Sequence, residues 1–222
     1  AHNNARLLSE IVNEFDVPNV VLSNSKNAKL YYGKNELSLG QSNLIELAKI
    51  NCDIVISGII GMIGLHPAFA AISVGNDLAI ANKETLVSAG KIFIEKSNQN
   101  KSKIFPVDSE HSAIFQCLDK NNFSKVDFIT LTASGGPFLN TPLQDLKNIR
   151  PKDAIKHPVW KMGQKISVDS ATMFNKALEI IEASVLFDIS SSNIEVVIHP
   201  EHIIHGLVHY KDGSILANLG FP

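Results

Sequence analysis

The stretch that decides the fold runs from residue 78 to residue 107 and reads LAIANKETLVSAGKIFIEKSNQNKSKIFPV. It begins with the apolar run Leu78–Ala81, continues with a helical pattern from Lys83 to about Ser97, and ends with Lys103–Val107. A short apolar run on each side of a helix is typical of neighbouring parallel strands joined by a covering helix. The stretch therefore predicts a strand–helix–strand unit of an α/β sheet.

The same alternation extends toward the N-terminus. Helical patterns over residues 4–15, 42–50 and 65–74 alternate with the apolar runs Val20–Leu22 and Asp53–Ser57. We therefore expect a Rossmann-like parallel sheet domain over residues 1–107, covered by helices on both faces. Ligands of such sheets bind at the carboxyl ends of the strands. Those ends read Ser57-Gly58, Asn82-Lys83-Glu84 and Asp108-Ser109-Glu110.

The pattern changes after about residue 107, which predicts a second domain over residues 108–222. A helix over residues 110–118, a strand at Phe128–Thr132, a polar stretch over 137–168 and a long helix over 170–187 are expected. Three strand-like runs follow, and they are Ile194–His199, Ile203–Tyr210 and Ser214–Leu219. An Asp-Gly turn joins the last two and indicates a hairpin. We expect an α+β domain with a mixed or antiparallel sheet.

Composition excludes several classes of partner. The chain has 222 residues, of which 45% are hydrophobic and 19% charged, and its formal net charge is −2. This near-neutral charge argues against nucleic acid or an anionic membrane as the main partner. The longest apolar run, Ile54–Leu65, is too short to span a bilayer. Cys52 and Cys117 stand in apolar contexts, which predicts buried, reduced thiols.

Two carboxylates follow the apolar run that ends at residue 107. Asp108 and Glu110 would point the same way if the backbone is extended, because side chains alternate along a strand. A third carboxylate, supplied by Glu179 of the long helix, would complete an oxygen-rich site for Mg²⁺ or Mn²⁺. The alternative is an ordinary helix N-terminus, where Asp and Ser are good caps and acids favour the first turn.

The start of the long helix also carries polar side chains. Asn175, Lys176 and Glu179 share one face by their i, i+3 and i+4 spacing. With Ser170 they would form a phosphate site from neutral donors, a point charge and the helix dipole. An exposed helix face with a Lys176–Glu179 ion pair is the alternative.

Three further segments each allow two interpretations. Ser134-Gly135-Gly136 is a phosphate-binding loop or a plain turn. His157 and Trp160 lie in a stretch without periodicity, which is typical of a lid, although a core Trp beside an incidental His is equally compatible. The run His199–His209 is rich in histidine but lacks the HExxH spacing of metalloproteases, so zinc is not favoured.

Together, these motifs resemble the 1-deoxy-D-xylulose 5-phosphate reductoisomerase family. They follow the family's order across nearly the whole chain, and they are Ala81–Glu84, Pro106–His111, Ala133–Phe138, His157–Gly163, Ile166–Met173, Asn175–Glu179 and Asp212–Ala217. The resemblance implies an NADP-dependent oxidoreductase and isomerase. Its reaction rearranges and reduces 1-deoxy-D-xylulose 5-phosphate to 2-C-methyl-D-erythritol 4-phosphate, using NADPH, in non-mevalonate isoprenoid biosynthesis.

The resemblance also implies roles for individual residues. The metal ligands for Mg²⁺ or Mn²⁺ are Asp108, Glu110 and Glu179, and the catalytic residues are Lys83, Glu110, His157 and Glu179. The implied substrate contacts are Lys83, Ser109, Glu110, Ser134, His157, Trp160, Ser170, Asn175, Lys176 and Glu179. Asn82, Glu84 and Gly163 match positions that line NADPH. Residues 156–165, with Trp160 and Met162, match a flap that closes over the substrate.

The family context gives further expectations. The resemblance implies a homodimer and a cytoplasmic location in a bacterium, with a plastid as the alternative. The family's Gly-rich phosphate loop and C-terminal helical domain have no counterpart in these 222 residues, so the chain alone is expected to be an internal fragment with little or no turnover. Glu201, His202 and Gly206 depart from the family pattern near the substrate. Another metal-dependent sugar-phosphate oxidoreductase, or an inactive sugar-phosphate binding module, remains the alternative function.

Overall fold

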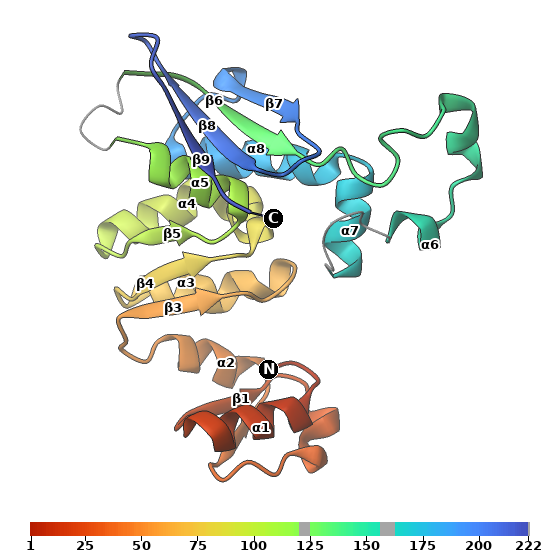
Figure 1. Cartoon of the computed structure of the whole chain (residues 1–222). Helices are drawn as coiled ribbons and strands as arrows, with labels where there is room; N and C mark the ends of the chain where they lie inside the picture. Colours follow the sequence, from red (N-terminus) through yellow and green to blue (C-terminus); the bar gives the residue numbers. More distant parts are fainter. Residues whose placement is uncertain (120–124, 156–162, 222) are drawn as a thin grey trace. The chain divides into compact units, whose positions relative to one another are not determined.

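The computed structural model describes residues 1–119, 125–155 and 163–221, which form two compact units (Figure 1). The first unit contains Ala1–Asn82 and Glu95–Ile104, and the second contains Lys83–Ile94 and Phe105–Pro222. Helix α4 (Lys83–Gln99) and strand β5 (Ile104–Pro106) therefore contribute residues to both units. The functional domain boundary expected at residue 107 stays a prediction, because this division reflects compactness alone.

The first unit has the expected parallel strands and helices. Strands β1 (Val20–Leu22) and β2 (Leu37–Leu39) form one parallel pair. Strands β3 (Ile54–Ser57), β4 (Asp77–Ile80) and β5 form a second sheet in that order, and β3 runs parallel to β4. The helical elements are α1 (Ala5–Phe15), η1 (Ser25–Leu30), α2 (Gln41–Ala48), η2 (Met62–Gly64) and α3 (Leu65–Ser73). The parallel α/β architecture is thus confirmed.

Two details of the first unit differ from expectation. Strand β2 was not predicted, because three residues of mixed burial give no periodic signal. Cover on both faces was also expected, but Ile54 and Ile56 of the edge strand β3 are 44% and 74% exposed. The buried Asn76 explains how this sheet is joined to α2, since its amide donates to the carbonyls of Ala48 and Ile50 at 3.1 and 2.8 Å.

The second unit is built on a mixed sheet in the order β7-β6-β8-β9. Strand β6 (Val126–Ala133) is parallel to β7 (Ile194–Ile198) and antiparallel to β8 (Ile204–Tyr210), which pairs with β9 (Ile215–Leu219) in the expected hairpin. Helices α5 (Ser109–Cys117) and α8 (Phe174–Phe187) share one buried apolar cluster with β6, β7 and β8. Its members include Ile114, Ile129, Leu131, Ala183 and Val208. The α+β prediction with a mixed sheet is confirmed.

The prediction of a single long helix over residues 170–187 is wrong. The chain forms α7 (Gln164–Ala171) and α8 instead, and Met173 between them has a left-handed φ of 60°. A non-glycine residue in this conformation ends the helical path without any Gly or Pro signal in the sequence. The polar stretch before α7 contains η4 (Leu143–Asn148) and α6 (Pro151–Ala154), and η5 (Ser191–Asn193) follows α8.

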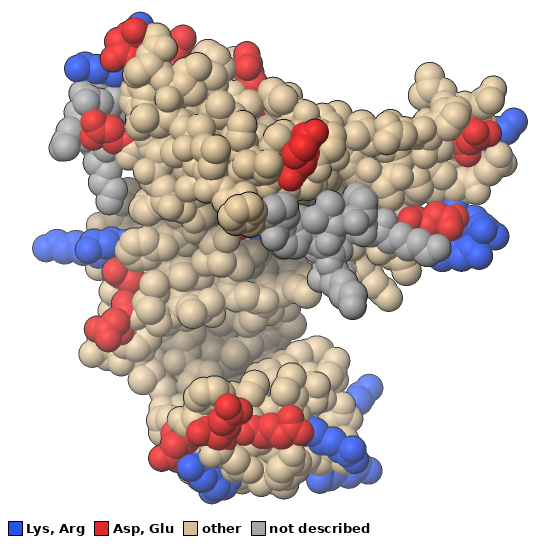
Figure 2. Space-filling view, in the orientation of Figure 1, with Lys and Arg blue, Asp and Glu red and all other residues tan. Residues whose placement is uncertain are grey.

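Surface properties agree only in part with the composition. Cys117 is buried, but Cys52 is exposed, so the prediction of two buried thiols is wrong for Cys52, which lies in the surface turn before the edge strand β3. Acidic and basic side chains are interspersed on the face shown in Figure 2. Within the described residues, every helix is too short or too polar to span a membrane.

Candidate metal and substrate site

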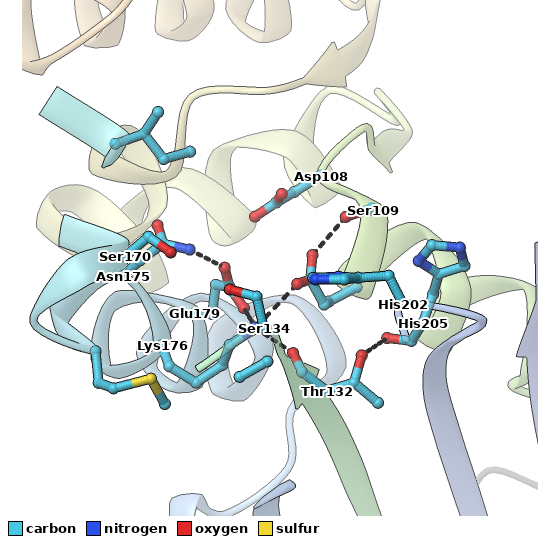
Figure 3. Close-up of a pocket in the computed structure, with 14 residues that line it drawn as sticks. Asp108, Ser109, Thr132, Ser134, Ser170, Asn175, Lys176, Glu179, His202 and His205 are labelled. Carbon is cyan, nitrogen blue, oxygen red and sulfur yellow. Dashed lines mark hydrogen bonds and ion pairs between the residues drawn. The ribbon is translucent and has the colours of Figure 1, made fainter. Parts of the chain in front are cut away.

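A pocket in the second unit lies beside the N-terminal ends of α5 and α8, the carboxyl end of β6 and the end of α7 (Figure 3). Its cavity volume is about 100 Å³. Its polar lining consists of Asp108, Ser109, Glu110, Thr132, Ser134, Ser170, Asn175, Lys176, Glu179, His202 and His205. Helix N-termini favour anionic groups, and the carboxyl end of a strand directs the following loop into the site.

Three carboxylates converge in this pocket. One oxygen from each of Asp108, Glu110 and Glu179 lies within 4.8 Å of the other two. The Glu179 side chain is only 1% exposed, so its carboxylate is almost completely withdrawn from water. A set of close carboxylate oxygens matches the ligand preference of Mg²⁺ and Mn²⁺. The donor chemistry therefore fits the divalent cation expected from the sequence.

The backbone places the first two carboxylates differently from expectation. Asp108 is the N-cap of α5 and Glu110 lies in its first turn, so the extended geometry assumed from the sequence holds only up to Asp108. The helix N-terminus considered as an alternative is therefore present as well. Among the described residues, however, the Asp108 carboxylate caps no backbone N–H of α5. It is free to contact side chains from other elements.

Two buried lysines neutralise the carboxylates. The Lys83 ammonium lies 2.9 Å from Asp108 Oδ2 and 3.5 Å from Glu179 Oε1, and it donates to Asn175 Oδ1 at 2.9 Å. The side chains of Lys83 and Lys176 are only 8% and 7% exposed. The Lys176 ammonium lies 3.0 Å from Glu110 Oε1, pairs with Glu179, and donates to the Thr132 carbonyl. Each lysine thus bridges two of the three acids.

The pKa values of these groups reflect burial and mutual charge. Burial raises the pKa of Glu179 to about 7, and the neighbouring Glu110 carboxylate adds to this, against the opposing Lys176 ammonium. Burial lowers the pKa of Lys83, but Asp108 and Glu179 outweigh it and hold that pKa above its usual value. Burial also lowers the pKa of Lys176, but the Glu179 and Glu110 carboxylates outweigh this effect and raise that pKa above its usual value. A divalent cation would therefore compete with a proton for Glu179.

The hydroxyl and amide groups expected to bind substrate reach the same pocket. Ser134 and Ser170 both line it, and the Gly136 N–H donates to Ser134 Oγ at 3.1 Å. Gly136 has φ +71°, and a Cβ there would lie 2.8 Å from the Ser170 carbonyl oxygen. The loop thus packs directly on the end of α7, which requires glycine at position 136. The Asn175 amide donates to Glu179 Oε1. Substrate contact by these residues stays a prediction.

The three residues expected at NADPH lie in different surroundings. Asn82, in the first unit, is 2% exposed and donates to the Ile59 and Gly61 carbonyls, so it fixes the loop after β3. In the second unit, Glu84 Oε1 lies 2.8 Å from Lys165 Nζ, and Gly163 is the N-cap of α7. Cofactor contact by these residues stays a prediction.

Part of the expected site lies outside the described residues. His157, Trp160 and Met162 belong to this part, and so does the expected flap up to residue 162. Only residues 163–165 of that flap are described, and they begin α7. The roles expected of His157 and Trp160 remain predictions.

Two buried residues beside the pocket were not assigned from the sequence. His111 of α5 is 0% exposed, and its Nδ1 lies 3.4 Å from Asp108 Oδ2 and 3.7 Å from Glu182 Oε2. Burial opposes protonation of His111, but Asp108 and Glu182 raise its pKa to about 9. Burial raises the pKa of Glu182 to about 7, against the His111 ring. The sequence signal was present, because each residue follows an expected metal ligand by three positions on a helix.

Two of the expected departures from the family pattern, His202 and Gly206, lie at the site or next to it. His202, where the family pattern has another residue, lines the pocket and has a left-handed φ of 55°. Burial lowers the pKa of His202, while Glu110 opposes this. His205 also lines the pocket, and its carbonyl accepts from Thr132 Oγ1 at 3.1 Å. Gly206 packs against Ile114, to which an added Cβ would approach within 2.9 Å.

Comparison with known proteins matches both parts of the chain to one family. Residues 1–90 match the model of 1-deoxy-D-xylulose 5-phosphate reductoisomerase, and residues 104–187 match the model of its C-terminal domain. The reductoisomerase of Clostridium perfringens is 47% identical over 230 aligned residues, which cover the whole chain and 60% of that protein. The enzyme of Clostridium tetani is 50% identical, over 90% of the chain and 51% of that protein.

Solved structures agree with these matches. A reductoisomerase in complex with NADPH, fosmidomycin and magnesium superposes with a TM-score of 0.94 at 39% identity, covering all of this chain and 59% of its own. The Zymomonas mobilis enzyme in complex with NADPH gives 0.89 at 39% identity, covering all of this chain and 58% of its own. The chain thus spans between 51% and 60% of the length of these relatives. By sequence, by family models and by fold, the chain belongs to the 1-deoxy-D-xylulose 5-phosphate reductoisomerase family.

Proposed function

We propose that the full-length gene product carrying this chain converts 1-deoxy-D-xylulose 5-phosphate to 2-C-methyl-D-erythritol 4-phosphate with NADPH, in non-mevalonate isoprenoid biosynthesis. The observation that carries the proposal is the convergence of Asp108, Glu110 and Glu179 in one pocket of a chain that belongs to this family. Mg²⁺ or Mn²⁺ and NADPH are the proposed cofactors, because related structures contain NADPH and magnesium. A homodimer in the bacterial cytoplasm completes the proposal.

The carboxylates of the pocket and Lys83, which pairs with two of them, are the proposed reacting groups. A divalent cation held by Asp108, Glu110 and Glu179 would supply Lewis acidity toward the carbonyl and hydroxyl oxygens of the substrate. The Lys83 ammonium, 2.9 Å from Asp108, is charged and buried, so it can stabilise negative charge on a substrate oxygen. Ser109, which donates to Glu110 at 2.5 Å, is the proposed hydroxyl partner of the sugar.

The polar donors next to the carboxylates are the proposed phosphate site, and two of them, Asn175 and Lys176, contact Glu179 directly. Ser134, Ser170 and Asn175 supply neutral donors, and Lys176 at the start of α8 supplies positive charge. A helix N-terminus with such donors is a favourable environment for phosphate. We propose that His157 and Trp160 of the adjacent sequence complete the enclosure. Binding energy from the phosphate would then orient the reacting carbon atoms.

The nicotinamide cofactor is proposed to bind at the carboxyl ends of the parallel strands of the first unit. NADPH would supply the hydride for the reduction. The loop after β3 is fixed by the buried Asn82, which is the kind of preformed backbone that such ligands require. Asn82 is the residue of the first unit proposed to contact the cofactor, and cofactor contact by Glu84 and Gly163 of the second unit stays a separate prediction.

Oxidation of NADPH by the full-length gene product, with 1-deoxy-D-xylulose 5-phosphate and Mn²⁺, tests the proposal. We expect turnover that requires both substrate and cation. Glu179→Gln should lower kcat/KM by at least about 100-fold, because it removes a proposed metal ligand. Glu195→Gln on β7 is the matched control, since it removes the same charge from an exposed position.

Two results would contradict the proposal. Cation-independent turnover, or a Glu179→Gln variant as active as Glu195→Gln, would show that the carboxylate cluster is not the working metal site. NADPH and Mn²⁺ binding without turnover of 1-deoxy-D-xylulose 5-phosphate would favour the alternative of another sugar phosphate. His202 is the specific observation behind that alternative, because it lines the pocket at a position where the family pattern differs.

A further inference from the structure

Three buried polar atoms face one another next to the carboxylate cluster. They are Asp108 Oδ2, His111 Nδ1 and Glu182 Oε2. Asp108 Oδ2 pairs with Lys83 Nζ at 2.9 Å, whereas His111 Nδ1 and Glu182 Oε2 have no hydrogen-bond partner within the described residues. His111 Nδ1 lies 3.4 Å from the first oxygen and 3.7 Å from the second. Buried polar atoms are almost always paired in native proteins, so this triangle requires an explanation.

The other ring nitrogen of His111 decides how the triangle is arranged. His111 Nε2 lies 3.0 Å from the Glu179 carbonyl oxygen, which can only accept, so Nε2 must carry a hydrogen. Nδ1 then faces the carboxylate oxygens of Asp108 and Glu182, at 3.4 and 3.7 Å. Nδ1 is thus the atom through which the buried ring connects Asp108 to Glu182.

We propose that Glu182 and His111 form a positioning relay for Asp108. Glu182 orients the His111 ring, and Nδ1 of that ring holds Asp108 Oδ2, which also pairs with Lys83 at 2.9 Å. A carboxylate fixed through one oxygen presents the other to a divalent cation in a constant direction. The inference rests on the proposed metal site, and it names the two residues that orient one of its ligands.

The surroundings of His111 favour positioning over simple packing. The ring lies between α5 and α8, with its centroid 6.3 Å from that of Phe187 in a stacked arrangement. An apolar side chain could fill this place, and buried ionisable pairs are in general weak stabilisers compared with apolar replacements. An apolar side chain could not, however, hold the Asp108 carboxylate. This carboxylate caps no helix N–H within the described chain, so its orientation depends on contacts with other side chains. Residues that orient metal ligands in this way typically affect metal affinity.

The test compares Glu182→Gln, His111→Gln and the double variant in the full-length gene product. Mn²⁺ affinity is measured by electron paramagnetic resonance, without substrate or NADPH, and thermal unfolding is recorded for each protein. Each single variant should raise the Kd for Mn²⁺ by about 10-fold. The double variant should lose no more than the weaker-binding single variant, because the two residues act in series on Asp108. Glu195→Gln, with the same charge change at an exposed position, should bind Mn²⁺ like the wild type.

Steady-state kinetics supplies a second readout. At saturating Mn²⁺, the single variants should regain most of kcat, while the KM for NADPH should stay unchanged, because only the presentation of Asp108 is altered. An unchanged Kd for Mn²⁺ overturns the relay, as does an additive loss in the double variant. Failure of both single variants to fold also overturns it, since their role would then be structural. Because the Mn²⁺ titration needs no substrate, a protein that shows this dependence without converting 1-deoxy-D-xylulose 5-phosphate keeps the inference and loses the proposed function.

Discussion

Buried ionisable side chains dominate the candidate site. Glu179 and Glu182 are each 1% exposed, and Lys83 and Lys176 are buried beside them. Burying a charge is unfavourable unless it is paired, and here each lysine bridges two carboxylates. Removal of one partner would leave the other charge uncompensated. Stability and cation binding are therefore coupled through the same few side chains.

The metal-free protein should become less stable as the pH rises from weakly acidic to alkaline. Burial raises the pKa of Glu179 and of Glu182 from 4.5 to about 7, and the pKa of His111 is raised from 6.5 to about 9. The folded state therefore binds more protons than the unfolded state over these intervals, so the free energy of unfolding falls as the pH increases. Urea unfolding in the presence of a chelator, at a series of pH values, measures this.

The Glu182→Gln variant is the control for this pH dependence. It removes one of the three titrating groups, so the decline in the free energy of unfolding between pH 4.5 and about pH 7 should be shallower than in the wild type. A free energy of unfolding that stays level or rises over the whole interval would contradict the assignment of these groups.

The two cysteines should differ in reactivity. Cys52 is exposed, whereas Cys117 is buried and burial raises the pKa of its thiol. Because the thiolate is the reactive form, iodoacetamide should modify Cys52 in the native protein and reach Cys117 only after unfolding. Mass spectrometry of peptides from briefly alkylated protein measures both rates. Equal modification of the two cysteines under native conditions would show that Cys117 is accessible and not buried as described.

Close contact between two elements shapes one wall of the pocket. The loop after β6 turns at Gly135 and Gly136, both with positive φ, and runs directly over the end of α7. The separate helix α7 ends there because the chain turns at Met173 before α8 begins. Ser134 from the loop and Ser170 from α7 both line the pocket in this arrangement.

Gly136→Ala should therefore disturb the pocket as well as the backbone. The alanine would have to keep the left-handed φ of +71°, and its Cβ would lie 2.8 Å from the Ser170 carbonyl oxygen. Gly213→Ala is the matched control, because Gly213 has φ +86° with nothing within 4 Å of an added Cβ. Both variants should lose about 1 kcal/mol for the left-handed backbone, and Gly136→Ala should lose more.

The two variants should also separate in kinetics. Only Gly136→Ala should raise the KM for 1-deoxy-D-xylulose 5-phosphate, because only this glycine contacts the wall that carries Ser170. Urea unfolding and steady-state rates of the full-length gene product measure both effects. Equal stability losses and unchanged KM values would show that the loop does not pack on α7 as described.

Sequence patterns predicted some elements well because their signals are local. The apolar runs before Asn82 and Asp108 predicted β4 and β5, and the Asp-Gly turn predicted the β8–β9 hairpin. The break at Met173 was missed, because a non-glycine residue in a left-handed conformation leaves no signal in the sequence. Glu182 was missed for a different reason: its spacing from Glu179 is visible in the sequence, but its role depends on a contact between α8 and α5. Contacts across elements need the tertiary structure.

At the scale of the whole molecule, the second unit collects its site from separate passes of the chain. Lys83 enters this unit at the start of α4, the chain then contributes residues 95–104 to the first unit, and it returns through β5 to Asp108. Glu179 arrives much later, on α8. The motif series was informative because these widely spaced segments meet: Lys83 pairs with Asp108 and Glu179, which line one pocket. The chain spans between 51% and 60% of the length of the relatives named above, so whole-enzyme tests require the full-length gene product.

The most direct test of the account is a crystal structure of the full-length protein grown with Mn²⁺ and recorded for anomalous scattering. The account predicts one strong anomalous peak coordinated by Asp108, Glu110 and Glu179, with the Asp108 carboxylate still held by His111. A peak among Asp108, His111 and Glu182, which form the other cluster of possible ligands, would contradict both the metal site and the relay. The absence of any peak in this pocket at saturating Mn²⁺ would contradict the metal site itself.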